Sequence, residues 1–287
     1  NISLSMAAIP LSGTIYAITR GKYNFQVKEL TLAFDDLPEA FDGFIIVQFS
    51  DFHAGSFDDY EQVKRGLSLI NEAHPDLIVF TGDLVNNRPQ EAKPFIDLLS
   101  ALDAPYGKFS ILGNHDYGDY MPFKNEEERQ LNREHLERIH SQCGFDLLNN
   151  ATRMIQKDSD SIALMGVENW GNTPFPQYGD LDIVTKGIDE QQFSILLSHD
   201  PDHWEDVAKD YPKKFNLTLS GHTHGAQFGV DIPGWQWSPV KYRYKRWLGL
   251  YEFKKQYLFV SKGFGFLGFP GRIGMSPEIV VFKLKRN

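Results

Sequence analysis

The sequence predicts an α/β fold built from two mixed β-sheets whose outer faces are covered by helices. Up to about residue 141, apolar runs alternate with stretches of helical periodicity, as in parallel strands joined by crossover helices. Beyond residue 144, short apolar runs follow one another with little helix between them, which predicts a second, partly antiparallel sheet. At 287 residues, with 41% hydrophobic and 23% charged side chains, the chain is long enough for a large globular domain.

The first half supplies the strands and helices of a parallel sheet. Residues 25–34 alternate polar and apolar side chains like an edge strand, whereas residues 44–49 are almost continuously apolar, like a buried strand. Two more strands are expected at residues 77–80 and 108–112. The helices are expected at residues 58–73, at 89–102, with proline in the first turn, and at 125–141.

The second half contains shorter strands and fewer helices. One helical stretch is expected at residues 202–209. The expected strands lie at residues 145–148, 152–156, 162–167, 193–197, 215–219, 249–253, 256–260 and 278–284. This change of pattern favours two mixed sheets with helices outside over one doubly wound sheet.

The first 24 residues differ in character from the rest. Residues 2–18 are apolar and rich in small side chains, contain Pro10, and precede Arg20 and Lys22. The stretch is slightly short for a membrane span, so it is the tail of a longer span, an interfacial anchor, or a segment packed on the domain. We expect residues 1–24 to be the remnant of a membrane anchor and residues 25–287 to form the domain. The cations favour the cytoplasmic face, with an extracytoplasmic position as the alternative.

Charge and cysteine content exclude several classes of protein. The net charge of −9 argues against binding to duplex nucleic acid, although residues 232–287 carry eleven Lys/Arg and only two Asp/Glu. The single cysteine, Cys143, excludes an intrachain disulfide framework and a zinc site built from several cysteines. Any bound metal must therefore be held by nitrogen and oxygen ligands.

Side chains that bind metals follow five of the expected strands. The five motifs are Asp51-Phe52-His53, Gly82-Asp83, Gly113-Asn114-His115-Asp116, His199-Asp200 and Gly221-His222-Thr223-His224. Because open α/β sheets bind ligands beyond the carboxyl ends of their strands, we expect these motifs to meet. One such motif alone is more often a polar loop, but five together indicate a metal site. The mixture of imidazole, carboxylate and amide favours zinc, manganese or iron.

In this order the motifs resemble those of the calcineurin-like metallophosphoesterases, over about residues 44–225. The resemblance implies a four-layer αββα sandwich with a dinuclear metal site at the carboxyl ends of the strands. The motif spacing and the closing segment 272–279 look most like the bacterial, membrane-associated branch of the family. The implied ligands of the two divalent ions are Asp51, His53 and His224 for one ion, Asn114, His199 and His222 for the other, and Asp83 for both.

The expected chemistry is hydrolysis of a phosphate ester. Two cations that share a carboxylate, roughly 3.5–4 Å apart, acidify a water for attack on phosphorus. His115, beside the expected ligand Asn114, is then placed to protonate the leaving oxygen. Where the Ser/Thr protein phosphatases of the family carry an Asp-Arg pair, this chain has Asn86 and Asn87, with Arg88 one place later. This departure argues against a protein phosphatase, although Asn86 remains a candidate contact of His115 and of the substrate.

Two aromatic segments near the C-terminus are candidates for substrate or membrane contact. Residues 235–250 interleave Trp and Tyr with Lys and Arg. This pattern fits a folded hairpin, contact with lipid or a lipid-like substrate, or stacking on a nucleobase. Residues 262–272 are rich in glycine and phenylalanine, which fits a lid or an apolar wall, and Arg272 is a candidate phosphate contact.

We therefore expect a dinuclear metal-dependent phosphoesterase that hydrolyses a phosphodiester, pyrophosphate or phosphomonoester at a membrane. A lipid-linked or nucleotide-linked substrate is expected, such as the UDP-diacylglucosamine that some members of the family cleave. No protein partner is evident. The alternative is a catalytically inactive, metal-binding scaffold or partner-binding module at a membrane. It is less favoured because each expected ligand position carries a competent side chain.

Overall fold

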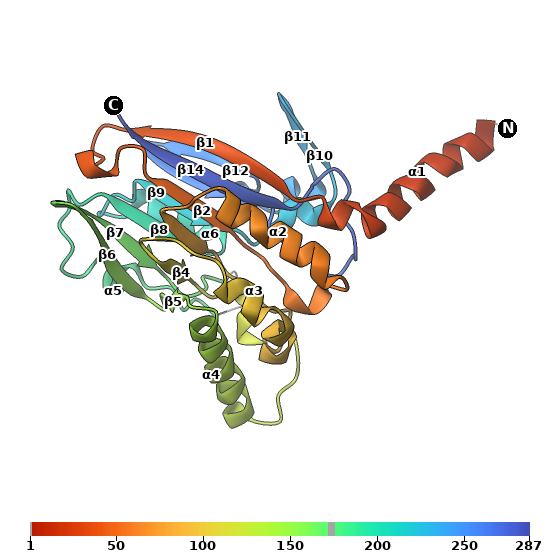
Figure 1. Ribbon diagram of the computed structural model, residues 1–287, viewed down its shortest axis with the longest axis horizontal. Coiled ribbons are helices and arrows are strands. Elements are labelled where there is room, and N and C mark those ends of the chain that lie inside the picture. The colour runs from red at the N-terminus through yellow and green to blue at the C-terminus, as the bar shows by residue number, and fades with distance from the viewer. Residues whose placement is uncertain (1, 172–175) are drawn as a thin grey trace.

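Residues 2–171 and 176–287 are described by the structure, a computed structural model in which two large sheets lie face to face (Figure 1). Each sheet has six strands, parallel and antiparallel pairs occur in both, and helices cover the outer faces. The predicted α/β architecture of two mixed sheets between helices is confirmed.

The first sheet has the strand order β1-β14-β2-β3-β4-β5. The strands are Gln26–Phe34, Glu278–Arg286, Ile45–Phe49, Leu77–Phe80, Lys108–Ser110 and Asp146–Leu147. Strands β2 to β5 are parallel, whereas β14 pairs antiparallel with β2. Strand β1 lies at the edge, as its alternating sequence predicted. Because β2, β3 and β4 are parallel, the loops that follow them lie at one edge of the sheet.

The second sheet has the order β12-β13-β9-β8-β7-β6. Its strands are Gly249–Phe253, Gln256–Val260, Leu217–Ser220, Ser194–Leu197, Asp160–Gly166 and Ala151–Lys157. A separate hairpin, β10 (Val230–Ile232) and β11 (Trp235–Trp237), interrupts the path from β9 to β12. Strand β11 overlaps the start of the basic aromatic segment 235–250, but β10 precedes that segment, which continues as a 3-10 helix at Pro239–Tyr242.

The helices are α1 to α6, with bounds Ile2–Thr19, Tyr60–Glu72, Ile96–Ser100, Glu126–Gln142, Leu181–Thr185 and Pro201–Asp206. The expected helix at residues 89–102 is a 3-10 helix, Pro89–Phe95, followed by the short α3. The reason is Pro94, which has no backbone N–H to donate inside a helix. Helix α5 was not expected from the sequence.

Three hydrophobic clusters fill the spaces between the four layers. Val47 and Phe49 of β2 pack with α2, α3 and α4 on the outer face of the first sheet. Ile46, on the opposite face of the same strand, belongs to the cluster between the two sheets. A third cluster joins α5 and α6 to the outer face of the second sheet. The alternation along β2 follows from the two-residue period of a strand.

The two sheets are also joined by polar contacts where their strands end. Nε2 of Gln48 on β2 donates to the carbonyl oxygen of Ser220 on β9, at 3.0 Å. The same nitrogen lies 2.9 Å from Oγ1 of Thr81, just beyond β3. These buried bonds hold the carboxyl ends of both sheets together, so the loops beyond them converge.

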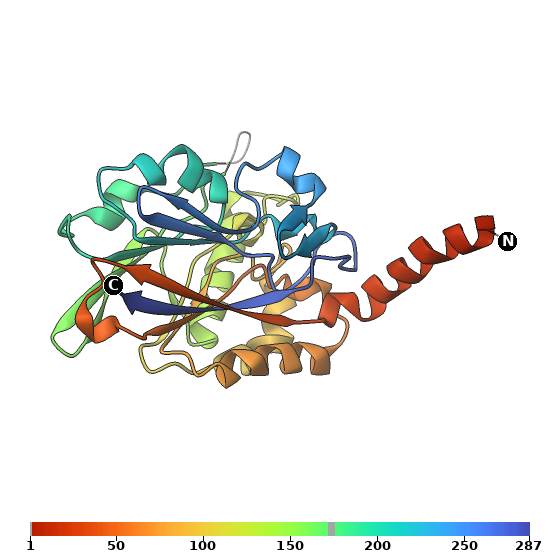
Figure 2. The same ribbon diagram turned by 90° about the horizontal axis from the view of Figure 1, so that it is seen from above.

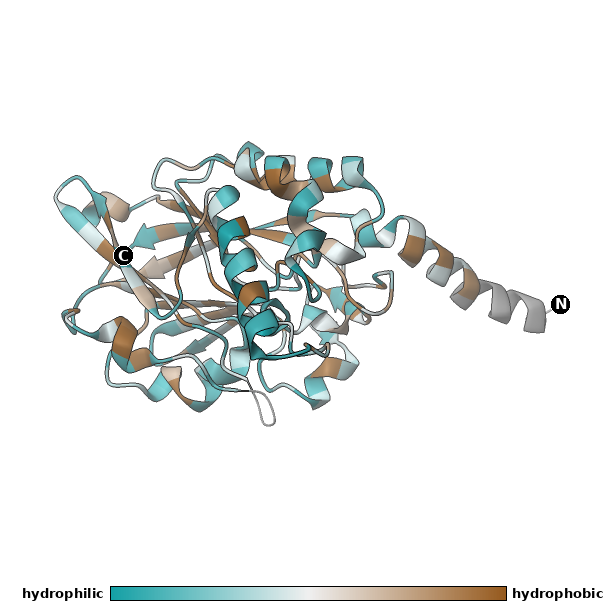
Figure 3. Ribbon diagram, turned by 90° about the horizontal axis from the view of Figure 1, so that it is seen from below, coloured by the Kyte–Doolittle hydropathy of each residue, from teal (hydrophilic) through white to brown (hydrophobic). Residues whose placement is uncertain are grey.

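Helix α1 projects from one end of the body (Figures 1 and 2). Leu11 and Ile15 are 62% and 55% exposed. Hydrophobic residues, brown in Figure 3, recur along the coloured part of the helix. Among the described residues, no helix is both long and apolar enough to cross a membrane. The residues after α1 are tied to the domain, because Lys22 forms a 2.7 Å ion pair with Asp58.

Candidate metal centre

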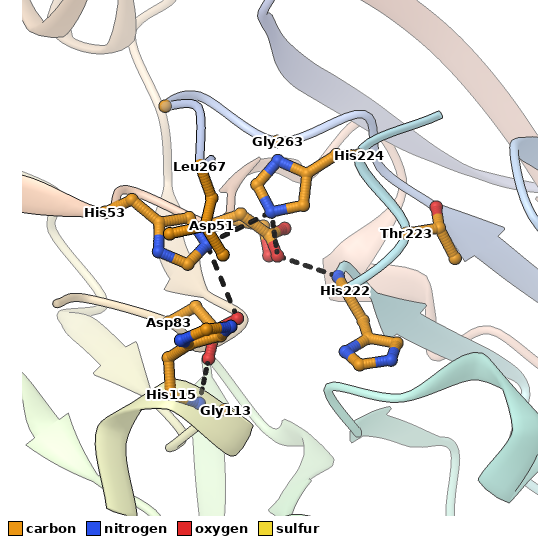
Figure 4. Close-up of polar contacts among 12 residues, drawn as sticks. Asp51, His53, Asp83, Gly113, His115, His222, Thr223, His224, Gly263 and Leu267 are labelled. Carbon is orange, nitrogen blue, oxygen red and sulfur yellow. Dashed lines mark hydrogen bonds and ion pairs between the residues drawn. The ribbon is translucent and has the colours of Figure 1, made fainter. Parts of the chain in front are cut away.

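The first group of expected ligands lies where strands of both sheets end (Figure 4). Asp51 and His53 follow β2, Asp83 follows β3, and His224 follows β9. Nε2 of His224 lies 3.1 Å from Nε2 of His53 and 3.4 Å from Oδ1 of Asp51. One nitrogen or oxygen of each of these four residues lies within 4.8 Å of the others. They are close enough to share one ion.

The second group consists of Asn114 after β4, His199 after β8 and His222 after β9. Oδ1 of Asn114 lies 3.1 Å from Nε2 of His199 and 2.8 Å from Nδ1 of His222. The two imidazole nitrogens are 3.3 Å apart. One amide oxygen and two imidazole nitrogens therefore point at a common position.

Asp83 belongs to both groups. Its Oδ2 lies 3.6 Å from Nε2 of His53 in the first group and 3.2 Å from Nε2 of His199 in the second. Its side chain also falls within both of the clusters whose ligand atoms could surround an ion. The other oxygen, Oδ1, accepts a 2.8 Å hydrogen bond from the backbone N–H of His115. Asp83 therefore has the position of a bridging ligand.

The backbone at these residues is strained. A positive φ is uncommon for residues other than glycine and costs about 1–3 kcal/mol at each position. The expected ligands that adopt it are Asp51 (52°), His53 (50°), Asp83 (60°), His222 (73°) and His224 (51°). Such strain is concentrated at functional sites, where the surrounding structure holds side chains in a required direction.

Two glycines of the motifs leave the room that the carboxylates occupy. A Cβ atom at Gly221 would lie 2.3 Å from Oδ2 of Asp51, and a Cβ atom at Gly113 would lie 2.3 Å from Oδ1 of Asp83. Both distances are far inside van der Waals contact. The glycines of the Gly-His and Gly-Asn motifs are thus required by the close approach of the ligands.

Outer contacts fix which imidazole nitrogens face the site. Nδ1 of His199 lies 2.7 Å from the carbonyl oxygen of Thr81. Because a carbonyl only accepts, Nδ1 carries the proton. Nδ1 of His53 lies 3.0 Å from Oδ1 of Asn86, whose Nδ2 donates to Ser56. In the neutral form of both imidazoles, the lone pair is then on Nε2, the atom that faces the ligand groups.

The donor set fits divalent metal ions. Oδ2 of Asp51 is buried and has no hydrogen-bond partner among the described residues, and an unsatisfied buried carboxylate oxygen is costly. Nε2 of His53 and Nε2 of His224 lie 3.1 Å apart, a distance at which at most one of the two nitrogens can carry a proton. A cation bound between these atoms would satisfy all of them. Imidazole, carboxylate and amide donors together suit zinc, manganese or iron.

Burial and neighbouring charges shift the pKa values of the protein groups. Burial raises the pKa of Asp51 to about 6 and lowers those of His53 and His222 to about 3. Burial alone would lower the pKa of His199, but the carboxylate of Asp83 outweighs it and raises that pKa to about 10. In the absence of cations, Asp83 and His199 are therefore a buried ion pair, while His53 and His222 are neutral.

His115, the expected general acid, lies at the edge of the site. Its Nδ1 is 2.9 Å from the backbone carbonyl of Asn86, so Nδ1 is protonated and held by the loop after β3. Its ring stacks on Tyr120, with 4.3 Å between centroids, and meets the ring of His53 edge to face at 5.0 Å. The imidazole is thus fixed next to the ligands, with Nε2 as the atom left for proton transfer.

The two candidate substrate-binding residues have other contacts. The side chain of Asn86 faces His53, and only its backbone contacts His115. Arg272 is 2% exposed and donates to the carbonyl oxygens of Gly265, Lys262 and Met275 at 2.8–3.0 Å. Its guanidinium is therefore directed at the backbone of the 262–272 loop. Direct contact of the Asn86 and Arg272 side chains with phosphate stays a prediction, because both side chains would have to change rotamer to make it.

Asp116 was quoted in the central motif but given no role, and the structure places it under the site. Its carboxylate accepts hydrogen bonds from the backbone N–H groups of Gly113, Asp83 and Leu84 at 2.9 Å, and of Val85 at 3.2 Å. It therefore ties the loop after β4 to the loop after β3. An aspartate two residues after the expected ligand Asn114 was the only signal in the sequence.

The chain is similar in sequence to known phosphoesterases. Residues 44–226 match the family model described as calcineurin-like phosphoesterase. The chain is 34% identical to the uncharacterized metallophosphoesterase YkuE of Bacillus subtilis, over 94% of this chain and 89% of that protein. It is 30% identical to the UDP-2,3-diacylglucosamine pyrophosphatase LpxG of Chlamydia trachomatis, with 69% of each chain covered.

Two further proteins are similar to this chain, one in sequence and one in structure. The phosphodiesterase YaeI of Escherichia coli is 28% identical, over 84% of this chain and 82% of that protein. Among solved structures, the NAD nucleotidase NadN of Haemophilus influenzae matches with a TM-score of 0.51 and 13% identity, covering 77% of this chain and 45% of the other. At that identity the structural match supports the fold alone.

Proposed function

Because this chain belongs to the calcineurin-like phosphoesterase family, whose members are metal-dependent hydrolases, we propose that it hydrolyses phosphate esters with two divalent ions. The proposed ligands are Asp51, His53 and His224 for one ion, Asn114, His199 and His222 for the other, and Asp83 for both. Manganese, zinc and iron are the proposed metals, from the donor chemistry.

The position of Asp83 carries this proposal. A single carboxylate faces both ligand groups, with Oδ2 3.6 Å from His53 and 3.2 Å from His199. Bound ions would supply Lewis acidity to the phosphoryl oxygens and to the attacking water. The inactive-scaffold alternative would not require a shared, buried carboxylate that is surrounded by competent donors.

His115 is the proposed general acid. Its Nδ1 is held by the carbonyl of Asn86, and its ring is fixed between His53 and Tyr120. In its cationic form the ring also carries a proton on Nε2, which it can donate to the leaving oxygen and so return to the neutral imidazole; without that proton the oxygen would depart as an unstable alkoxide. A fixed ring matters because proton transfer requires the donor within hydrogen-bond distance of the leaving oxygen.

The proposed substrate is a lipid-linked or nucleotide-linked phosphodiester or pyrophosphate, such as UDP-diacylglucosamine. One support is the similarity to LpxG, whose name gives that substrate class. Another is the apolar character of the 262–272 loop, in which Leu267 is half-buried and Phe269 is 39% exposed, whereas Phe264 and Phe266 pack in the core against Phe52 and Phe57. An apolar wall beside the phosphoester site suits an acyl chain or a nucleobase.

We also propose that the domain works at a membrane, on the cytoplasmic side. Three large side chains on or next to the β10–β11 hairpin are exposed: Phe228 (46%), Ile232 (52%) and Trp235 (57%). The hairpin and α1 lie at the same end of the molecule (Figure 2). Exposed aromatic side chains close to lysine and arginine suit an interface with anionic lipid. The side chain of Trp235 is exposed, as contact between the 235–250 segment and lipid requires.

Hydrolysis by reconstituted protein tests the proposal. Chelator-stripped protein receives manganese, zinc or iron separately, and turnover of bis-p-nitrophenyl phosphate and p-nitrophenyl phosphate is followed. Metal-restored turnover is expected, and Asp83→Asn is expected to reduce it by about three orders of magnitude while the protein stays folded. If no metal restores turnover, or if Asp83→Asn retains it, the two-ion mechanism is wrong. The preferred ester then directs the search for the native substrate.

A further inference from the structure

Two tyrosine hydroxyls contact the second ligand group from segments near the surface. The hydroxyl of Tyr244 lies 2.7 Å from Nε2 of His222. The hydroxyl of Tyr120 accepts a 2.6 Å hydrogen bond from Nδ2 of Asn114. Tyr244 belongs to the basic aromatic segment before β12, and Tyr120 lies between β4 and α4. Neither tyrosine was among the residues that the sequence motifs identified.

The contact of Tyr244 matters because His222 faces the site through Nδ1. Nδ1 lies 2.8 Å from Oδ1 of Asn114 and 3.3 Å from Nε2 of His199. A neutral imidazole whose Nδ1 lone pair binds a cation must carry its proton on Nε2. That proton needs an acceptor, and the Tyr244 oxygen is the near one, since Oδ2 of Asp200 lies at 3.6 Å. The hydroxyl can accept the proton of this tautomer and therefore holds the direction of the His222 ring.

Tyr120 acts on the neighbouring side chain. An amide group can turn by half a rotation, and only its oxygen can bind a cation. With Nδ2 of Asn114 engaged by Tyr120, Oδ1 faces His199 and His222. The same tyrosine ring stacks on His115, nearly parallel to it, with 16° between the planes. Tyr120 thus holds one expected ligand through its hydroxyl and the proposed general acid through its ring.

The first ligand group is held differently. His53 contacts Asn86 in the loop after β3, and Asp51 accepts a 2.8 Å bond from the backbone of His222. His224 lies 3.4 Å from the guanidinium of Arg272, itself fixed by buried carbonyl groups. Among the contacts of the described residues, tyrosine hydroxyls thus reach the second group and not the first. Tyr120 is also 48% exposed, whereas Arg272 is 2% exposed.

We propose that Tyr244, with Tyr120 as its counterpart, positions the ligands of the second ion and so sets the affinity of that ion independently of the first. The proposal rests on the two-ion site proposed above. Its consequence is that the basic aromatic segment, which the sequence related to lipid or nucleotide contact, also controls occupancy of the metal centre. A change in that segment would change metal occupancy, and through it activity, without touching a ligand.

Stepwise metal binding tests this proposal. Chelator-stripped wild type, Tyr244→Phe and Tyr120→Phe are titrated with manganese by calorimetry, and electron paramagnetic resonance distinguishes a coupled manganese pair from a single ion. Tyr242→Phe is the matched control, because Tyr242 lies two residues from Tyr244 and is 78% exposed. Removing the Tyr244 hydroxyl is expected to weaken the second binding step about 10–100-fold and to leave the first within about twofold. Thermal unfolding of the metal-free proteins is expected to be unchanged.

The outcomes separate this inference from the proposed function. Selective loss of the second step, with loss of the coupled signal at limiting manganese, supports the role of Tyr244. Equal weakening of both steps, or isotherms identical to those of wild type, overturns it while leaving the two-ion site intact. Wild type that binds a single ion overturns the two-ion site itself, and the inference with it.

Discussion

Oδ2 of Asp83 lies 3.2 Å from Nε2 of His199, and the two residues come from different sheets. Asp83 follows β3 of the first sheet and His199 follows β8 of the second. Their mutual attraction holds the pair in its charged form, because the positive charge of His199 keeps the pKa of Asp83 well below its ordinary value against the effect of burial. Without metal, this ion pair joins the two halves of the fold.

The metal-free protein is expected to lose stability as the pH rises. The pKa of His199 is raised from 6.5 to about 10 in the folded state, so its contribution is complete below about pH 6.5 and is lost as the pH approaches 10. For one proton, the free energy of unfolding changes by at most about 1.4 kcal/mol per pH unit. Urea unfolding in chelator at several pH values measures it. His199→Gln should flatten the curve, whereas His135→Gln, on the exposed face of α4, should not.

Removal of His115 is expected to affect substrates according to their leaving group. His115→Ala should slow hydrolysis of alkyl or phenyl esters by about 10²–10⁴-fold, because their leaving oxygens need a proton. Hydrolysis of p-nitrophenyl esters should change much less, because p-nitrophenolate leaves readily as an anion. Steady-state rates on a series of aryl esters measure the dependence. An equal loss on all esters would contradict the role of general acid.

Asp116 is expected to be essential for the structure of the site. Asp116→Ala leaves four buried backbone N–H groups without their acceptor. The free energy of unfolding should fall by about 3 kcal/mol or more. Asp119→Ala, which removes a partly exposed carboxylate paired with Arg129, should cost less than about 1 kcal/mol. Denaturant unfolding measures the loss of unfolding free energy in both variants. Similar losses would contradict the structural role of Asp116.

The hairpin is expected to contribute to membrane binding. Ile232→Glu with Trp235→Glu removes two exposed hydrophobic side chains, each worth about 1.5–3 kcal/mol when buried. Partition onto vesicles of phosphatidylglycerol and phosphatidylcholine should therefore fall at least about tenfold. Leu131→Glu is the control, because Leu131 is 45% exposed on α4, away from the hairpin (Figure 1). Equal vesicle binding by the Ile232→Glu/Trp235→Glu protein and by Leu131→Glu would contradict membrane contact by the hairpin.

Much of the fold followed from local patterns in the sequence. Residues 249–253 and 256–260 coincide with β12 and β13, because alternation and turn residues report the local backbone directly. The α-helix expected at residues 89–102 is instead a 3-10 helix followed by the short α3, for an equally local reason. Pro94 has no backbone N–H to donate inside an α-helix, but the helical periodicity of its neighbours still predicted one. The position of the ligand motifs after strands was also readable, since parallel strands bring their carboxyl ends together.

The sequence by itself determined which residues are candidates for the chemistry, because glycine, histidine and aspartate recur at the ends of apolar runs. Only the tertiary structure decided what each of them contacts. His222 meets Asp51 across 171 positions and Tyr244 across 22, and Arg272 turns inward to backbone carbonyls. The physical reason is that periodicity encodes local conformation and burial. The direction of a side chain is set by packing between two sheets that are distant in the chain.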